Sequence, residues 1–288
     1  MFRIIILLII IFGSGCNPSP VLVNEEPSPI DPSKTLTFPA ETKTATITLS
    51  PTTMLALDPT ITLAPTINAP GFSSPLERFS VDELVGMISN LYNPPAPGSD
   101  DPHQGVDFSV VDPFYGYATK GAAVQSILGG KVVVVINDRF PYGNSIVVET
   151  SFEDLPTSWQ NYLQNLDRPA LFGTNPALTC PEGWDQVQNE VDSLSLYILY
   201  AHLDEKPNHT AGDQMEVGNL VGTIGDSGNA LAPHIHIEMR YGISGSLEGT
   251  MAHYDVTASE NEMATYCRWR VSGLYRVLNP LDLLLLDP

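Results

Sequence analysis

The chain after Asp107 is a series of short apolar runs, and part of it alternates between polar and apolar residues in the way that is typical of a β-strand. The clearest example is residues 233–239, Pro-His-Ile-His-Ile-Glu-Met. Side chains two residues apart in a strand project from the same face, so the two histidines would share one face while the two isoleucines enter a core. The other apolar runs in this part are short and are separated by Gly, Asn and Pro, which indicates an all-β domain.

One segment before this region has helical spacing instead. Ser80 and Glu83 stand at the positions of a capping box, which marks the start of a helix. We therefore predict a short N-terminal helix that packs on the β-domain. The apolar residues that recur at helical intervals are Val81, Leu84, Val85, Ile88, Leu91 and Tyr92.

The N-terminus has the pattern of an export signal. Residues 4–12 are an unbroken apolar run, shorter than the roughly 20 residues needed to span a bilayer. Residues 14–16, Ser-Gly-Cys, resemble a bacterial lipobox, although Gly13 stands where that motif prefers Leu. We predict that residues 1–16 are a lipoprotein signal peptide with its lipobox and that Cys16 is lipidated. This would give an extracytoplasmic, membrane-anchored protein; the alternative is an ordinary secretory signal with an incidental cysteine.

Composition divides the rest of the chain in two. Residues 17–74 are rich in Pro, Thr and Ser, and their recurrent prolines prevent a packed sheet, so we predict a disordered tether. Residues 75–288 form the predicted folded domain. They hold 28 of the 33 acidic and 10 of the 13 basic residues, within a net charge of −20. This charge argues against nucleic acid as a partner, because such partners favour basic surfaces.

Four of the six histidines fall in three short segments, which suggests one shared site. In a straight strand His103 and Asp107 would lie roughly 13 Å apart, so the chain must bend between them, and Gly105 permits this bend. Residues 209–213 repeat the His-x-x-x-Asp spacing but have the composition of a turn. Imidazoles and a carboxylate are the ligands of catalytic zinc. The three segments are His103-Gln-Gly-Val-Asp107, Tyr200-Ala-His202-Leu203 and His234-Ile-His236.

The combined motif set resembles that of the LytM/lysostaphin-type zinc metallopeptidases, which cleave peptide bonds in bacterial peptidoglycan. The matching motifs are His-x-Gly-x-Asp-Phe, Tyr-Ala-His-Leu, and Gly-Asp-Ser-Gly-Asn followed by Ala-Pro-His-Ile-His-Ile-Glu. The resemblance covers roughly residues 96–150 and 194–288. It implies an antiparallel β-sandwich with a zinc groove across one sheet.

The resemblance also implies roles for single residues. His103, Asp107 and His236 would hold one Zn²⁺ ion and leave a position for water. His202 and His234 would flank that water as catalytic residues. The chemistry agrees, because hydrolysis at an open zinc site needs a proton acceptor and a proton donor, and these two histidines could act in either order.

The resulting prediction is a zinc-dependent endopeptidase that acts on stem peptides or cross-bridges of peptidoglycan. Some relatives keep the fold without the ligands and activate other wall hydrolases. All five site residues are present here, so a non-catalytic, wall-binding activator is the alternative. A third hypothesis is a metallopeptidase that acts on secreted proteins or glycine-rich peptides.

Two segments, residues 151–193 and 242–276, are insertions relative to the compact family pattern. Each contains one cysteine. With Cys16 assigned to lipid, we predict a disulfide between Cys180 and Cys267, the alternative being two free thiols. We also hypothesise that the stapled insertions wall the groove and shape substrate choice. Tryptophans in these insertions are expected to pack in the core rather than bind ligand: Trp159, Trp184 and Trp269.

Overall fold

The computed structural model describes residues 71–172, 176–186 and 193–286. The predicted signal peptide, the lipidation of Cys16 and the tether up to residue 70 lie outside these residues. Within the described part, no helix is both long and apolar enough to cross a bilayer.

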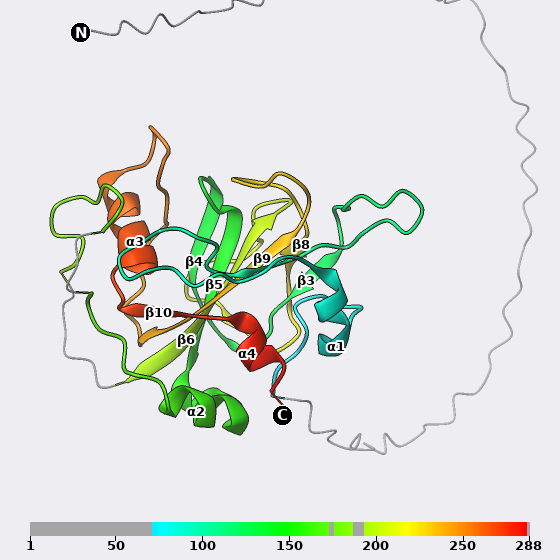
Figure 1. Ribbon diagram of the computed structural model, residues 1–288, viewed down its shortest axis with the longest axis horizontal. Helices are drawn as coiled ribbons and strands as arrows, with labels where there is room; N and C mark the ends of the chain where they lie inside the picture. Colours follow the sequence, from blue (N-terminus) through cyan, green and yellow to red (C-terminus); the bar gives the residue numbers. More distant parts are fainter. Residues whose placement is uncertain (1–70, 173–175, 187–192, 287–288) are drawn as a thin grey trace, which may run out of the picture. The chain divides into compact units, whose positions relative to one another are not determined.

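The described residues form a large antiparallel sheet and a small second sheet (Figure 1). The large sheet has the strand order β1-β2-β9-β6-β5-β4-β7, and β10 pairs with the same edge of β9 as β2 does. The small sheet pairs β3 with β8. The predicted antiparallel all-β class is confirmed. The strands are β1 (Ile88–Asn90), β2 (Val106–Phe108), β3 (Ala123–Gln125), β4 (Gly130–Arg139), β5 (Gly143–Ser151), β6 (Leu194–Leu203), β7 (Gln214–Met215), β8 (Leu220–Thr223), β9 (Ile235–Ile243) and β10 (Tyr275–Leu278).

The main hydrophobic core joins the two sheets. Alternation along β9 sends Ile235 and Ile237 into this core, as the sequence pattern predicts, and the core also holds Val124 of β3 and Val221 of β8. All four side chains are at most 2 % exposed. The large sheet thus has one face committed to the core, and its other face is available for a site.

A second cluster covers part of that other face. Val147 and Leu199, which point away from the main core, pack with Trp269 of helix α3 (Glu260–Val271). This helix lies within residues 242–276, the second predicted insertion. Its first turn is closed by a capping box, in which Ser259 accepts from the N–H of Glu262 and Glu262 accepts from the N–H of Ser259. The second insertion is therefore packed on the sheet face that carries the site.

The predicted N-terminal helix is present but short. Its capping box forms, because Glu83 accepts hydrogen bonds from the backbone and hydroxyl of Ser80. Helix α1 (Val81–Leu84) passes into a 3-10 turn (Val85–Met87) and then into strand β1. The helical spacing of Ile88 and later residues was therefore misleading. Pairing of β1 with β2 supplies backbone hydrogen bonds across the sheet, and this tertiary contact outweighs local periodicity.

Further helical segments and a disulfide complete the described part of the domain. The first insertion holds a 3-10 turn (Phe152–Asp154) and helix α2 (Thr157–Gln164), and helix α4 (Pro280–Leu284) follows β10. The predicted disulfide is present between Cys180 and Cys267, which are 87 residues apart in the sequence.

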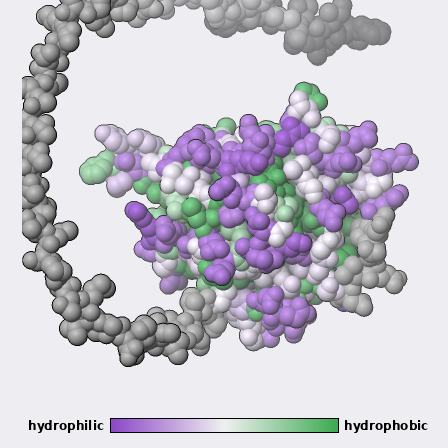
Figure 2. All heavy atoms as spheres, turned by 180° about the vertical axis from the view of Figure 1, so that it is seen from behind, coloured by the Kyte–Doolittle hydropathy of each residue, from purple (hydrophilic) through white to green (hydrophobic). Residues whose placement is uncertain are grey.

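The three tryptophans differ in their burial. Trp159 and Trp269 are fully buried, as predicted, whereas Trp184 is partly exposed. Trp159 packs against Phe72, whose burial places packed structure a few residues before Pro75. Figure 2 shows that hydrophilic residues cover most of one face, with hydrophobic residues visible between them near its middle.

Candidate metal centre

The pairing of β2 with β9 brings two of the predicted ligands together. Asp107 and His236 are direct register partners in this antiparallel pair. Their neighbours Val106, Phe108, Ile235 and Ile237 enter the main core, so both polar side chains point to the opposite face.

A close turn returns His103 to the same point. A Cβ atom at Gly105 would lie 2.5 Å from the carbonyl oxygen of Ile237 and 2.6 Å from the ring of His236. Only glycine fits between the two segments at this distance. The bend that the sequence requires between His103 and Asp107 is therefore present, and the missing side chain at Gly105 is what permits it.

The ligand atoms of these three residues meet at one point. His103 Nε2 lies 3.0 Å from Asp107 Oδ1 and 3.0 Å from His236 Nδ1, and His236 Nδ1 lies 2.8 Å from Asp107 Oδ1. Ligands held by bonds of 2.0–2.2 Å at the corners of a tetrahedron are about 3.3–3.5 Å apart. A small outward movement of each side chain would therefore admit an ion, and the three residues could hold a metal.

The charges of the site favour a cation at this point. Burial opposes ionisation of Asp107, but hydrogen bonds from His103 and His236 outweigh it and hold the pKa of the carboxyl well below its usual range. Burial also opposes protonation of His236, yet hydrogen bonds to Asp107 and Glu238 raise its pKa to about 9. Without an ion, a proton on His236 supplies the positive charge that these carboxylates attract.

Each of the two predicted ligand histidines makes a second hydrogen bond that orients its ring. His103 donates from Nδ1 to the carbonyl oxygen of Leu91 at 2.9 Å, which leaves Nε2 for an ion. His236 donates from Nε2 to the carboxylate of Glu238 at 3.4 Å. Such outer partners fix the tautomer of a metal-binding histidine and its orientation. Sequence reasoning assigned no role to Glu238, although the alternation of β9 places it on the same face as His236.

A bulge in β6 brings His202 to the groove. The register between β5 and β6 shifts next to His202, whose φ of 62° is in the left-handed region. Tyr200 and Leu203 consequently both enter the main core, and His202 is released to the other face. Its Nδ1 donates to the carbonyl oxygen of Ser227 at 2.8 Å, and the Ser227 hydroxyl donates to the carbonyl of Leu203 at 2.7 Å. The Gly-Asp-Ser-Gly motif thus holds the His202 ring.

His234 completes the set of predicted residues. Its Nδ1 donates to the carbonyl oxygen of Ala232 at 2.8 Å, and its Nε2 lies 3.7 Å from Asp107 Oδ2. The His202 and His234 rings are 4.7 Å apart between centroids. Burial first, and then the nearby His236 and His234, lower the pKa of His202 to about 3, so His202 is neutral at neutral pH.

All five predicted residues line one groove of about 690 Å³. His209, which has the same His-x-x-x-Asp spacing, instead bonds the carbonyl of Leu220 in an exposed turn. Sequence reasoning missed several lining residues, most of which come from segments that are distant in the sequence: Asp100, Tyr142, Tyr254, Tyr266 and Arg270.

Comparison with known proteins finds likeness only among solved structures. No family model and no curated protein matches the chain. A zinc-containing peptidase from Vibrio cholerae is 22% identical over 53% of this chain and 32% of that chain, with a TM-score of 0.30. The catalytic domain of the antimicrobial peptidase lysostaphin from Staphylococcus simulans is 19% identical over 72% of this chain and 98% of that domain, with a TM-score of 0.36. This chain spans about a third of the Vibrio cholerae chain.

Proposed function

We propose that this chain is a LytM/lysostaphin-type zinc metalloendopeptidase that hydrolyses peptide bonds in the stem peptides or cross-bridges of peptidoglycan. One observation carries the proposal: His103 Nε2, Asp107 Oδ1 and His236 Nδ1 lie within 3.0 Å of one another in an open groove. Two imidazole nitrogens and one carboxylate oxygen are a donor set of catalytic zinc. Zinc in this site would polarise the scissile carbonyl and lower the pKa of water.

His202 and His234 would move protons beside that point. In each ring Nδ1 donates to a backbone carbonyl, at Ser227 for His202 and at Ala232 for His234. The neutral tautomer is thereby fixed, and Nε2 of each ring is the atom that can accept a proton. One histidine would take a proton from the attacking water and one would donate to the leaving amine.

The test combines a zymogram with metal analysis. Purified protein run in a gel that contains peptidoglycan should give a cleared zone that a chelator abolishes and added zinc restores. His202→Ala should keep bound zinc and lose clearing, whereas His103→Ala should lose both. Equal loss of zinc in the two variants would contradict the division into ligands and catalytic histidines.

Product analysis separates the proposal from its rivals. Mass spectrometry of digested peptidoglycan should find new amino and carboxyl ends in the peptide part. A wild-type protein that binds the wall without releasing fragments would be the non-catalytic activator. Cleavage of a glycine-rich peptide but not of wall would indicate the third hypothesis.

Export to the cell surface is part of the proposal. The resemblance of residues 14–16 to a lipobox supports it, and lipidation of Cys16 would keep the catalytic domain near the wall. Mass spectrometry of the N-terminal peptide from membranes checks this, because a mature protein with unmodified Cys16 would be secreted rather than anchored.

A further inference from the structure

A network of charged side chains, buried at Glu238 and Arg240 and open to the groove at Asp100 and Arg270, lies beside the predicted ligands. Its members are Asp100, Glu238, Arg240 and Arg270, together with the amide of Gln104. None of them is a predicted ligand or catalytic residue. Glu238 is fully buried, Arg240 is 1 % exposed, and the side chain of Arg270 is 11 % exposed.

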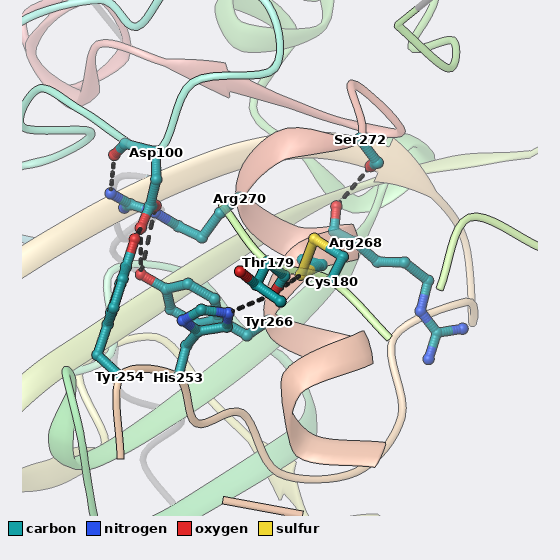
Figure 3. The surroundings of a disulfide bond; sticks show 10 residues. Asp100, Thr179, Cys180, His253, Tyr254, Tyr266, Arg268, Arg270 and Ser272 are labelled. Carbon is teal, nitrogen blue, oxygen red and sulfur yellow. Dashed lines mark hydrogen bonds and ion pairs between the residues drawn. A yellow bond between two sulfur atoms is a disulfide. The ribbon is translucent and has the colours of Figure 1, made fainter. Parts of the chain in front are cut away.

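Arg270 makes the contacts that join the parts of this network. Its Nη1 donates to Glu238 Oε2 at 3.2 Å. Its Nε donates to Asp100 Oδ1 at 2.5 Å, and its Nη2 donates to the backbone carbonyl of Asp100 at 2.7 Å. Figure 3 shows Arg270 extending from α3 to the Asp100 segment. The flat guanidinium fork thus binds two different chain segments at once.

The two segments are those that carry the predicted ligands. Glu238 accepts the hydrogen bond of His236 and therefore sets the orientation of that ring. Asp100 lies just before His103, and the Gln104 amide donates to the carbonyl of Asp100 at 3.1 Å. Arg270 is therefore hydrogen-bonded directly to both segments that carry a predicted ligand histidine: to Glu238 on the strand of His236, and to Asp100 just before His103.

The second arginine contacts the same two segments. Arg240, on β9, contacts both Glu238 and the side-chain oxygen of Gln104. Two carboxylates and two guanidinium groups together leave the network without net charge. Because Glu238 and Arg240 are buried, loss of one member leaves an opposite charge without its partner, which is destabilising unless the remaining side chains move.

Helix α3 is itself held in place by a disulfide and by a stacked ring. Cys267, on this helix, is bonded to Cys180. The ring of His253 stacks on Tyr266 of α3, and its Nε2 donates to the carbonyl of Thr179 at 2.7 Å. Figure 3 shows these contacts beside the disulfide. The helix that supplies Arg270 is therefore linked to the first predicted insertion, which contains Cys180 and Thr179.

We propose that Arg270 is a positioning residue of the metal centre, which orients His236 through Glu238 and fixes the His103 segment through Asp100. The disulfide-linked second insertion is then a structural part of the centre rather than only a wall of the groove. The inference rests on the proposed metal site, but it concerns affinity for the ion and does not depend on the substrate.

Arg268 offers a matched control on the same helix. Figure 3 shows Arg268 and Arg270 pointing to different sides of α3. Arg268 donates from Nη2 to the hydroxyl of Thr265 at 3.4 Å and is remote from the groove lining. Arg268→Met therefore removes the same charge and similar volume from α3 without touching the network.

The experiment measures zinc affinity by competition with a chromophoric chelator for the wild type, Arg270→Met, Arg270→Lys and Arg268→Met. We expect Arg270→Met to bind zinc about 10–100-fold more weakly, as when an outer partner of a ligand histidine is lost. Arg268→Met should stay within about twofold of the wild type. Arg270→Lys should recover part of the loss, because it keeps the charge but not the fork.

Two further readouts separate positioning from a general loss of fold. The visible spectrum of the cobalt-substituted protein should change in Arg270→Met and not in Arg268→Met, because it reports ligand geometry. If Arg270→Met does not fold, Asp100→Asn replaces it, since it weakens the same link without removing an arginine. Folded network variants with wild-type zinc affinity and an unchanged cobalt spectrum would overturn the inference. Failure of the wild type to bind zinc would instead overturn the proposed function.

Discussion

The β2–β9 strand pair and the second predicted insertion contribute side chains to the candidate metal centre in different ways. In the strand pair, Asp107 and His236 are placed by backbone register, so a two-residue sequence period already indicates which side chains share a face. In the insertion, Arg270 reaches the centre only because α3 packs on the sheet and is linked to a distant loop. The positions of the predicted ligands thus follow from a local sequence pattern, whereas the position of Arg270 depends on long-range packing.

Removal of the disulfide, which links the second predicted insertion to a distant loop, should have the largest effect on stability. The variant Cys180→Ser with Cys267→Ser should lose up to about 4–5 kcal/mol of unfolding free energy in the chain-entropy model, because the closed loop is long, with a sequence separation of 87. Urea unfolding of variant and wild type measures the difference.

The zinc affinity of the same double variant tests whether the insertion contributes to the proposed metal centre. If the insertion is part of the centre, looser packing of α3 should also weaken zinc binding. Under conditions where the variant is folded, wild-type zinc affinity would show that the strand pair holds the ion without help from the staple.

Glu238→Gln tests the point where the two regions meet. The substitution leaves the buried Arg240 and Arg270 without their shared carboxylate, and we expect a loss of about 3 kcal/mol in unfolding free energy. Chemical unfolding in the presence of a chelator measures this without a contribution from metal. Glu248→Gln, at an exposed position of the second insertion, is the control and should change stability little.

Gly105→Ala perturbs only the strand-pair region. The added methyl group would lie 2.5 Å from the Ile237 carbonyl and 2.6 Å from the His236 ring, so the His103 segment must move outward. We expect about 1–3 kcal/mol of destabilisation from overpacking, together with loss of zinc. Gly86→Ala is a matched control, because a Cβ there meets no atom within 4 Å. Equal effects of the two alanines on thermal unfolding and zinc content would count against the close approach.

Sequence reasoning succeeded where side-chain period alone determines position. Alternation in residues 233–239 correctly placed the isoleucines in the core. The capping box at Ser80 correctly marked a helix start, but the helix beyond it was overestimated because Ile88 pairs across the sheet instead. Local signals therefore located the elements and did not set their lengths.

The residues of the candidate site show the same difference between local pattern and long-range packing. The residues that converge on one point were identified from motifs, and Glu238 could have been added from the β9 period. The bulge that releases His202 depends on register with β5. The contact of Arg270 with Asp100 spans 170 residues of sequence. No local pattern encodes either feature, because each arises from the packing of separate segments.

The start of α3 provides the smallest and most local test. Burial opposes ionisation of Glu262, but hydrogen bonds from the Ser259 backbone and from Arg139 lower its pKa from 4.5 to about 2. A carboxyl with a lowered folded-state pKa stabilises the fold above its unfolded pKa of 4.5, and this contribution disappears as pH falls towards 2. At pH near 7, Glu262→Gln should therefore be less stable than the wild type by about 1–2 kcal/mol.

Denaturant unfolding of the wild type and Glu262→Gln between about pH 7 and pH 2, with chelator present, measures the difference in their unfolding free energies. It should be constant above about pH 5 and should narrow below pH 4.5. Glu260→Gln, which alters the exposed first helical residue and leaves the cap in place, is the control. If the difference in unfolding free energy did not change with pH, the contribution of Glu262 would come from packing and not from its ionised carboxylate. Zinc affinity should stay near the wild-type value in Glu262→Gln, because Arg270 lies two turns further along α3, where the disulfide and not the cap holds the helix.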